Sequence, residues 1–129
     1  MSYMLVVAAV YNAVWGGFVV LFPDLLFEWT GMQLPRYPEL WQCIGMVVGV
    51  YSVGYLAAAR DPYRHWPIVL VGLLGKVAGP IGFVQAIYTG SLPLAFGSTI
   101  LTNDLIWWIP FGLVLKGAYD HHRESEPNV

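Results

Sequence analysis

Four long apolar runs constrain the fold of this chain more than any other feature. They cover roughly residues 3–22, 39–59, 66–88 and 95–117, and each is long enough to cross a bilayer as a helix. The connecting segments are short and leave little chain for a soluble domain. The sequence therefore predicts an all-α integral membrane protein. We expect an antiparallel four-helix bundle in residues 1–118, followed by a polar cytoplasmic tail in residues 119–129.

The shortage of charged residues agrees with this prediction. Of the 129 residues 57% are hydrophobic and only 11% are charged, whereas about a quarter of a soluble domain is charged. The net charge is -2 and no basic run exists, which argues against a nucleic-acid partner. Membrane lipids are the expected surroundings. The first apolar run is too long for a cleavable signal sequence, so we expect it to stay as a span.

The segment PDLLFEWTGM, residues 23–32, lies between the first two runs. Pro23 suits a first helical turn and Gly31 suits a helix end. Asp24 and Glu28 share one face, and the apolar residues can share another. The pattern predicts a short interfacial helix between the first and second spans.

Lysine and arginine in the short loops predict the orientation. With four spans, the N-terminus, the 60–65 turn and the tail lie on one side. That side carries Arg60, Arg64, Lys116 and Arg123, whereas the other carries only Arg36. Both termini are therefore expected in the cytoplasm.

Two ionisable side chains, Lys76 and Asp104, lie deep within apolar runs. Insertion of each costs about 2.5–3.5 kcal/mol, and such residues seldom persist without a structural or functional role. By the helical rise, Asp104 lies about 13 Å and Lys76 about 18 Å from the outer end. A lysine stem spans the difference, so the sequence predicts that the two charges meet as an intramembrane ion pair.

Three interpretations of this pair remain open. It could fix the register of two helices, form a site for a ligand or ion, or direct one charge toward a partner subunit. The predicted site consists of polar and aromatic residues on the four spans: Lys76, Asp104, Asn103, Asn12, Gln42, Trp107 and Trp108.

Two prolines lie close to these charges. Pro80 cannot donate to the carbonyl of Lys76, and Pro110 cannot donate to the carbonyl of Ile106. A carbonyl freed at membrane depth needs another donor. We therefore expect a side chain, water or ligand at each.

Other residues offer weaker signals. Cys43 is the only cysteine, and packing is the alternative to a reactive thiol there. The side chains of Trp107 and Trp108 either serve packing alone or line a binding site for a flat ligand such as a quinone or an isoprenoid. No spacing predicts a metal or catalytic site, and the sequence identifies no cofactor.

Four strings carry a resemblance over nearly the whole chain: YNAVWGG, WQCIGMVVGVYSVGY, ARDPYRHWPIVLVGLLGKVAGPIGF and TNDLIWWIPF. They resemble a family of small four-span bacterial membrane proteins often loosely labelled alkyl hydroperoxide reductase-like. The resemblance implies the four-span fold and a bacterial inner (plasma) membrane. Its label would imply a thiol nucleophile at Cys43 with a resolving partner, and the chain has no second cysteine.

The leading hypothesis is a non-enzymatic binding or transport module. It would take a small ion or an amphipathic ligand from the outer leaflet at Lys76 and Asp104. One alternative is an accessory subunit of a larger membrane complex, and another is an enzyme acting on a lipid or quinone through Lys76 or Cys43. A transporter would need a homo-oligomer, for which exposed faces of Gly45 and Gly49 could serve.

Overall fold

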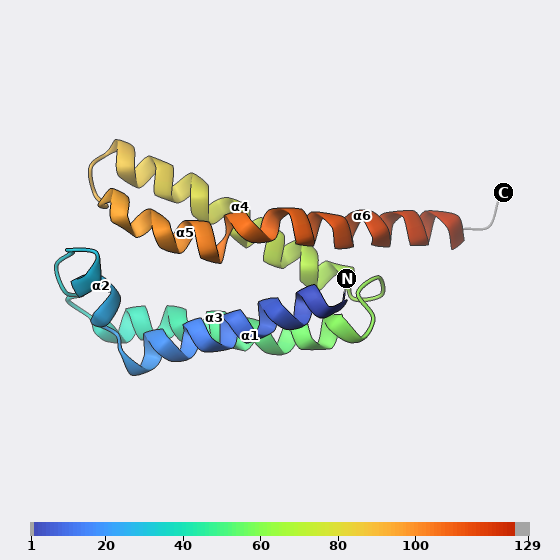
Figure 1. The fold of residues 1–129 in the computed structure, drawn as a ribbon, viewed down its shortest axis with the longest axis horizontal. Helices are drawn as coiled ribbons and strands as arrows, with labels where there is room; N and C mark the ends of the chain where they lie inside the picture. The colour runs from blue at the N-terminus through green and yellow to red at the C-terminus, as the bar shows by residue number, and fades with distance from the viewer. Residues whose placement is uncertain (1, 126–129) are drawn as a thin grey trace.

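The computed structural model describes residues 2–125, and these residues are helical apart from short connections (Figure 1). The elements in chain order are α1 (Ser2–Leu21), α2 (Leu25–Trp29), α3 (Pro38–Arg60), α4 (Trp66–Tyr88), the 3-10 turn η1 (Leu94–Phe96), α5 (Gly97–Asn103), the 3-10 turn η2 (Leu105–Trp107) and α6 (Trp108–Ser125). Within this part of the chain no strand occurs. Four helical stretches are long and apolar enough to cross a membrane, namely α1, α3, α4 and the stretch Leu94–Glu124.

The first three apolar runs match α1, α3 and α4 closely, but the fourth differs from the prediction in two ways. It is interrupted at Asp104, where α5 ends and η2 begins. It also continues as helix to Ser125, so no structural boundary separates residues 1–118 from the first part of the predicted tail. Residues 126–129 of that tail lie outside the described residues.

Helices α1 and α3 lie side by side along their length (Figure 1). Glycines permit this approach. A Cβ added to Gly16 would lie 2.5 Å from the carbonyl oxygen of Gly45 and 2.8 Å from the backbone nitrogen of Gly49. The GxxxG spacing of α3 therefore serves packing within the chain. The sequence predicted exposed faces at Gly45 and Gly49 for an oligomer. Gly45 is instead buried against α1, where an added Cβ would meet Val19, whereas an added Cβ at Gly49 would meet no atom within 4 Å.

The hydrophobic core joins this pair to the helices of the second half of the chain. Tyr55 on α3 and Phe111 on α6 meet edge to face, with ring centroids 5.2 Å apart. Nine buried residues form the core cluster: Leu5, Ala8, Ala9, Tyr55, Ala58, Val69, Trp107, Phe111 and Val114. They come from the first half of α1, the second half of α3, the start of α4, and η2 with α6. The core therefore lies toward the end of the molecule that holds the α3–α4 turn.

The opposite end is held by aromatic contacts around α2. Phe27 meets Trp41 of α3 edge to face at 5.2 Å, and Trp29 stacks on Phe18 of α1 at 5.8 Å. These contacts fix α2 against both neighbours although it has only five residues. Because Trp29 and Glu28 stay exposed, α2 presents an apolar and a charged side chain on the surface.

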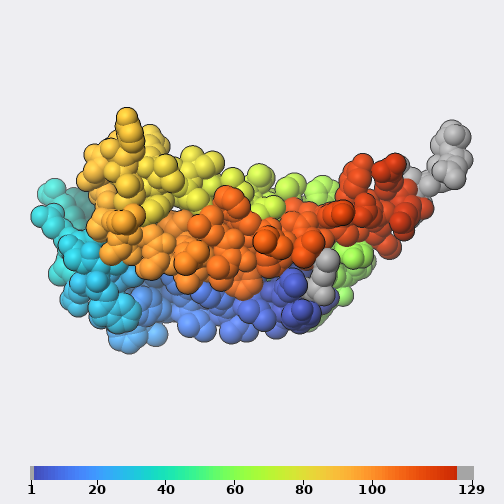
Figure 2. Space-filling model, turned by 45° about the horizontal axis from the view of Figure 1, so that its top comes forward, coloured from blue at the N-terminus to red at the C-terminus, as the bar shows by residue number. Residues whose placement is uncertain are grey.

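The end of α6 is attached to the α3–α4 turn, although its last turns project beyond the other helices (Figure 2). His122 donates from Nε2 to the carbonyl oxygen of Tyr63 at 2.8 Å. The Tyr63 ring packs against Gly117, where an added Cβ would lie 2.7 Å from the hydroxyl oxygen. These contacts extend the helix into the segment that the sequence predicts as a tail.

The close approach of α1 and α3 predicts different effects of substituting two adjacent glycines. Gly16→Ala should destabilise the protein by about 1–3 kcal/mol, because the new methyl group overlaps the α3 backbone. Gly17→Ala is the matched control, since a Cβ there meets no atom within 4 Å. Both substitutions gain the same helix propensity, so their difference in unfolding free energy, measured in mixed micelles, isolates the contact. Equal unfolding free energies would contradict this packing.

Candidate functional site

The interruption of the fourth apolar run at Asp104 is the origin of the site. Asp104 has φ -120° and ψ -62°, which is not helical. The N–H of Trp107 donates to the carbonyl of Asp104 at 3.1 Å, and not to that of Asn103 as an α-helix would require. Pro110 follows closely, and a proline distorts the turn that precedes it. The carbonyls of Thr102 and Asn103 are consequently left without their usual donors.

Side chains replace those donors. Trp107 donates from Nε1 to the carbonyl oxygen of Thr102 at 3.1 Å. Lys76 on α4 donates from Nζ to the carbonyl oxygen of Asn103 at 2.7 Å. Because the carbonyl end of a helix carries partial negative charge, an ammonium is a suitable partner there. The bond is charge-assisted and short, as expected for the stronger class of hydrogen bonds.

The Lys76 ammonium also lies near two aromatic rings. Its Nζ is 5.8 Å from the ring centroid of Trp107 and 5.6 Å from that of Phe111. Both distances allow a cation–π attraction, which is stronger where water is excluded. Lys76 is only 6% exposed. Its charge is therefore stabilised by one carbonyl and two ring faces.

The direct ion pair between Lys76 and Asp104 is not present among residues 2–125, which corrects the prediction. The two residues meet instead through the backbone of Asn103, because the helix break offers the ammonium a free carbonyl. Asp104 is 5% exposed and receives a long bond of 3.4 Å from Nδ2 of Asn103. It lies against Gly79 of α4, where an added Cβ would overlap the carboxylate. A glycine at this position thus gives the carboxylate its space.

The carbonyl that Pro80 leaves free does find a donor, as expected. Trp108 donates from Nε1 to the carbonyl oxygen of Lys76 at 2.9 Å. Lys76 therefore joins α4 to the broken helix twice, once through its side chain and once through its backbone. Trp107 and Trp108 do not line the polar cavity described next. The indole N–H of Trp107 bonds to a carbonyl of the break, and that of Trp108 bonds to the carbonyl that Pro80 leaves free on α4.

A cavity of about 220 Å³ lies beside the break, among α1, α3, α4 and α5. Its polar lining residues include Asn12, Tyr55, Lys76, Asn103 and Asp104. Four of the seven predicted site residues are thus brought to one space. Within residues 2–125 no group of three or more potential metal-ligating side chains occurs.

Two amides in this lining lack complete hydrogen bonding. Asn12 is 4% exposed, and its Oδ1 is buried without a partner among the described residues. The Oδ1 of Asn103 is also buried and has no hydrogen-bond partner among the described residues. An unpaired buried amide costs about 1–3 kcal/mol on protein mutational scales. Both side chains border the cavity, although these two oxygen atoms are themselves covered.

Tyr55 was not predicted from the sequence. Its ring packs on Gly72, where an added Cβ would overlap the hydroxyl group, and it borders the cavity. The spacing in the sequence indicates this position: Gly45, Ser52 and Tyr55 fall on one helical face, with Tyr55 three residues after Ser52.

The other predicted residues lie elsewhere. Gln42 donates from Nε2 to the carbonyl oxygen of Val20 at 2.8 Å, which satisfies one of the free carbonyls at the end of α1. It does not line the polar cavity. Cys43 is exposed on α3 with a free thiol and does not line it either.

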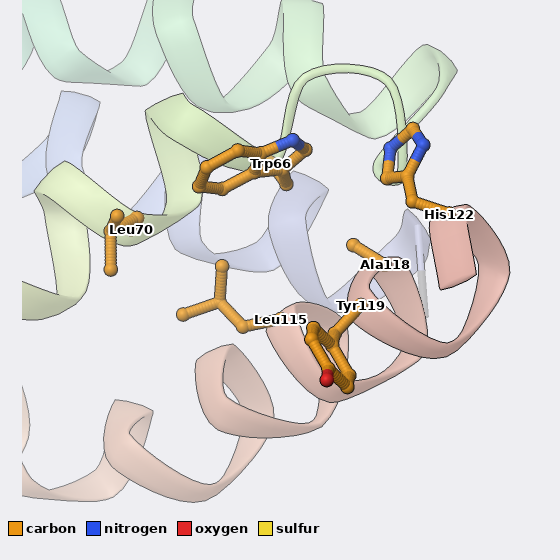
Figure 3. Close-up of a pocket in the computed structure, with 6 residues that line it drawn as sticks. All are labelled: Trp66, Leu70, Leu115, Ala118, Tyr119 and His122. Atoms are coloured by element: carbon orange, nitrogen blue, oxygen red, sulfur yellow. The ribbon is translucent and has the colours of Figure 1, made fainter. Parts of the chain in front are cut away.

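A second hollow of about 370 Å³ lies between the start of α4 and the end of α6 (Figure 3). Its lining residues are Trp66, Leu70, Leu115, Ala118, Tyr119 and His122. The lining is apolar except for the tyrosine hydroxyl, the indole N–H and the imidazole. None of the predicted site residues borders it, so it contributes nothing to the chemistry of the break.

No protein family, curated protein or solved structure shows significant similarity to the chain. The geometry of the site is therefore the basis of the functional argument.

The Trp108 bond predicts a specific non-additivity with Pro80. Trp108→Phe should cost about 1–3 kcal/mol, because it leaves the Lys76 carbonyl unpaired. Pro80→Ala restores a backbone N–H that can donate to that carbonyl. In the Pro80→Ala background the cost of Trp108→Phe should therefore fall below about 1 kcal/mol. Unfolding free energies of the four proteins provide the measurement, and equal costs in both backgrounds would show that the bond is not formed.

Proposed function

We propose that this protein is a membrane-embedded binding or transport module. In the proposal it is an antiparallel four-helix bundle of the bacterial plasma membrane, with both termini in the cytoplasm and α2 lying in the outer interface. The length and apolarity of four helical stretches support the membrane location. The distribution of lysine and arginine supports the orientation. The contacts of α2 with α1 and α3 support its place at the bundle end.

The observation that carries the proposal is the broken helix with two buried charges beside it. Non-helical backbone at membrane depth is tolerated where protein buries it or where it lines a polar cavity. Many transporters bind their substrates at such breaks, where free carbonyls and helix ends face the ligand. Here the Asn103 carbonyl, the Lys76 ammonium and the Asp104 carboxylate meet at the break. The unpartnered Asn12 amide borders the same cavity.

The cavity suits a small polar group. About 220 Å³ is below the roughly 300 Å³ at which drug-sized pockets begin, so it fits a small ion with its water or the head of an amphiphile. Lys76 and Asp104, which both line this cavity, would act as binding groups. A homo-oligomer or a larger complex would serve a transport role, since one bundle of four helices encloses little volume.

Retention of a bound small molecule tests the proposal. The full chain is extracted with its lipids into nanodiscs, and its bound small molecules are counted by native mass spectrometry. Lys76→Met and Asp104→Asn should each reduce occupancy about 10–100-fold, the effect of losing one charge-assisted hydrogen bond of about 1.5–3 kcal/mol. Lys116→Met and Asp120→Asn change exposed residues of the same types and should leave occupancy unchanged.

Two results would contradict the proposal. One is equal occupancy in all four variants. The other is the absence of any small molecule together with a stoichiometric partner protein whose association survives Lys76→Met and Asp104→Asn. The second result would instead support the accessory subunit.

A further inference from the structure

The polar cavity adjoins an apolar groove on the side of the molecule. That groove, of about 330 Å³, is lined by Tyr51, Pro67, Ile68 and Val71. Tyr51 and Val71 also line the polar cavity. The two spaces therefore lie next to each other between α3 and α4.

The mouth of the polar cavity lies at a depth that hydrocarbon would occupy. Its exposed lining residues are Val47 and Tyr51 on α3, and Val71 and Gly75 on α4. By the helical rise, Val71 is about 7 Å and Gly75 about 13 Å beyond the start of α4. In a spanning helix both positions lie within the roughly 30 Å hydrocarbon layer. The cavity therefore opens toward lipid tails.

Entry of a ligand into the polar cavity from the aqueous end of the molecule has less support than lateral entry. A hollow of about 460 Å³ lies between the loop that contains Gly31 and Gln33 and the turn that contains Gly90 and Ser91. It shares no lining residue with the polar cavity. The lateral mouth, in contrast, is bordered by exposed residues of α3 and α4.

The chemistry of the cavity selects the head of the ligand. The lining carries one ammonium, on Lys76, and one carboxylate, on Asp104, so a neutral head avoids an unbalanced charge. The Asn12 amide is buried without a partner for its oxygen within residues 2–125. A hydroxyl group can donate to an amide or carboxylate oxygen and accept from an amide N–H. A neutral hydroxyl is therefore the simplest head that satisfies the lining.

We propose that the site binds a single-chain, uncharged amphiphile with a hydroxyl head, which arrives laterally from the lipid between α3 and α4. Its hydroxyl lies in the polar cavity beside Asn12 and Asp104, and the first part of its chain lies in the groove at Val71 and Ile68. This inference rests on the proposed binding function and adds the ligand class and the route. The groove lies toward the α3–α4 turn, so access is from the leaflet on that side and not from the outer leaflet that the sequence suggested.

Photolabelling tests the head and the route together. The probe is a long-chain alcohol with a diazirine near its hydroxyl, offered to the full chain in nanodiscs, and labelled peptides are counted by mass spectrometry. Saturable labelling of α3 and α4 around Tyr51 and Val71 is expected, competed by the unlabelled alcohol. Chain-matched ammonium and carboxylate probes should label at least tenfold less, because each adds an unbalanced charge.

Two glycine variants provide the matched comparison for the route. Gly75→Trp places a large side chain at the mouth and should reduce labelling by the alcohol at least tenfold. Gly82→Trp is the control, because Gly82 is exposed on the same helix and does not line the cavity. At both glycines an added Cβ meets no atom within 4 Å, and the unfolding free energies of both variants, compared with that of the wild type, check that each one folds. Asn12→Leu should also lower labelling by the hydroxyl probe.

The possible outcomes separate this inference from the proposed function. Equal labelling by all three heads, or by wild type and Gly75→Trp, would overturn the inference. If Asp104→Asn still loses the retained small molecule in that case, the binding function stands and only the ligand class or route is wrong. If Asp104→Asn retains it as wild type does, the proposed function fails first.

Discussion

The structure depends on one hydrogen bond between a buried ammonium and a broken helix. Lys76 donates to the carbonyl of Asn103 at 2.7 Å, at the point where α5 ends. The carbonyl has lost its backbone donor, and the ammonium has little access to water. The Asp104 carboxylate borders the same cavity, but it forms no ion pair with Lys76 in the described part of the chain. Leaving either group unpaired costs more than the bond itself contributes. The break and the lysine therefore stabilise each other.

The surrounding residues extend this mutual dependence. Pro80 removes a donor from the Lys76 carbonyl, and Trp108 supplies one from the broken helix. Gly79 leaves room for the Asp104 carboxylate against α4. These features bring α4 and the fourth apolar stretch together at mid-helix and leave a polar space on the side that faces α1 and α3. The cavity is thus a consequence of the way the break is satisfied.

Much of the fold was predictable because apolar length determines it. The bounds of α1, α3 and α4 follow from hydrophobic runs and from nearby prolines and glycines. The break at Asp104 was not predicted, because Pro110 indicates a distortion without fixing the residue at which the helix ends. The ion pair between Lys76 and Asp104 was expected because the prediction assumed an unbroken helix. In a continuous helix the Asn103 carbonyl would be occupied, and Asp104 would be the natural partner of Lys76.

The sequence predicted which residues lie at the site better than it predicted the hydrogen bonds that they form. The cavity is bordered by Lys76, Asp104, Asn103 and Asn12. This was predictable because polar residues within apolar helices face the protein interior or a polar cavity. Gln42 and the two tryptophans instead bond to backbone carbonyls. Sequence periodicity gives the face of a helix and not the free carbonyls of a neighbouring one. Those carbonyls exist only because helices end or break where they do.

The distance between Lys76 Nζ and the carbonyl carbon of Asn103 tests the account most directly. The chain has only two lysines, Lys76 and Lys116, so a ¹⁵Nζ label is easily assigned with Lys116→Met. Solid-state NMR dipolar recoupling to a ¹³C-labelled Asn103 carbonyl, in lipid bilayers, should give about 3.5–4 Å, since the bond of 2.7 Å ends on a C=O of about 1.23 Å. A distance beyond about 6 Å, outside hydrogen-bonding range, together with a short distance to the Asp104 carboxyl carbon, would contradict it.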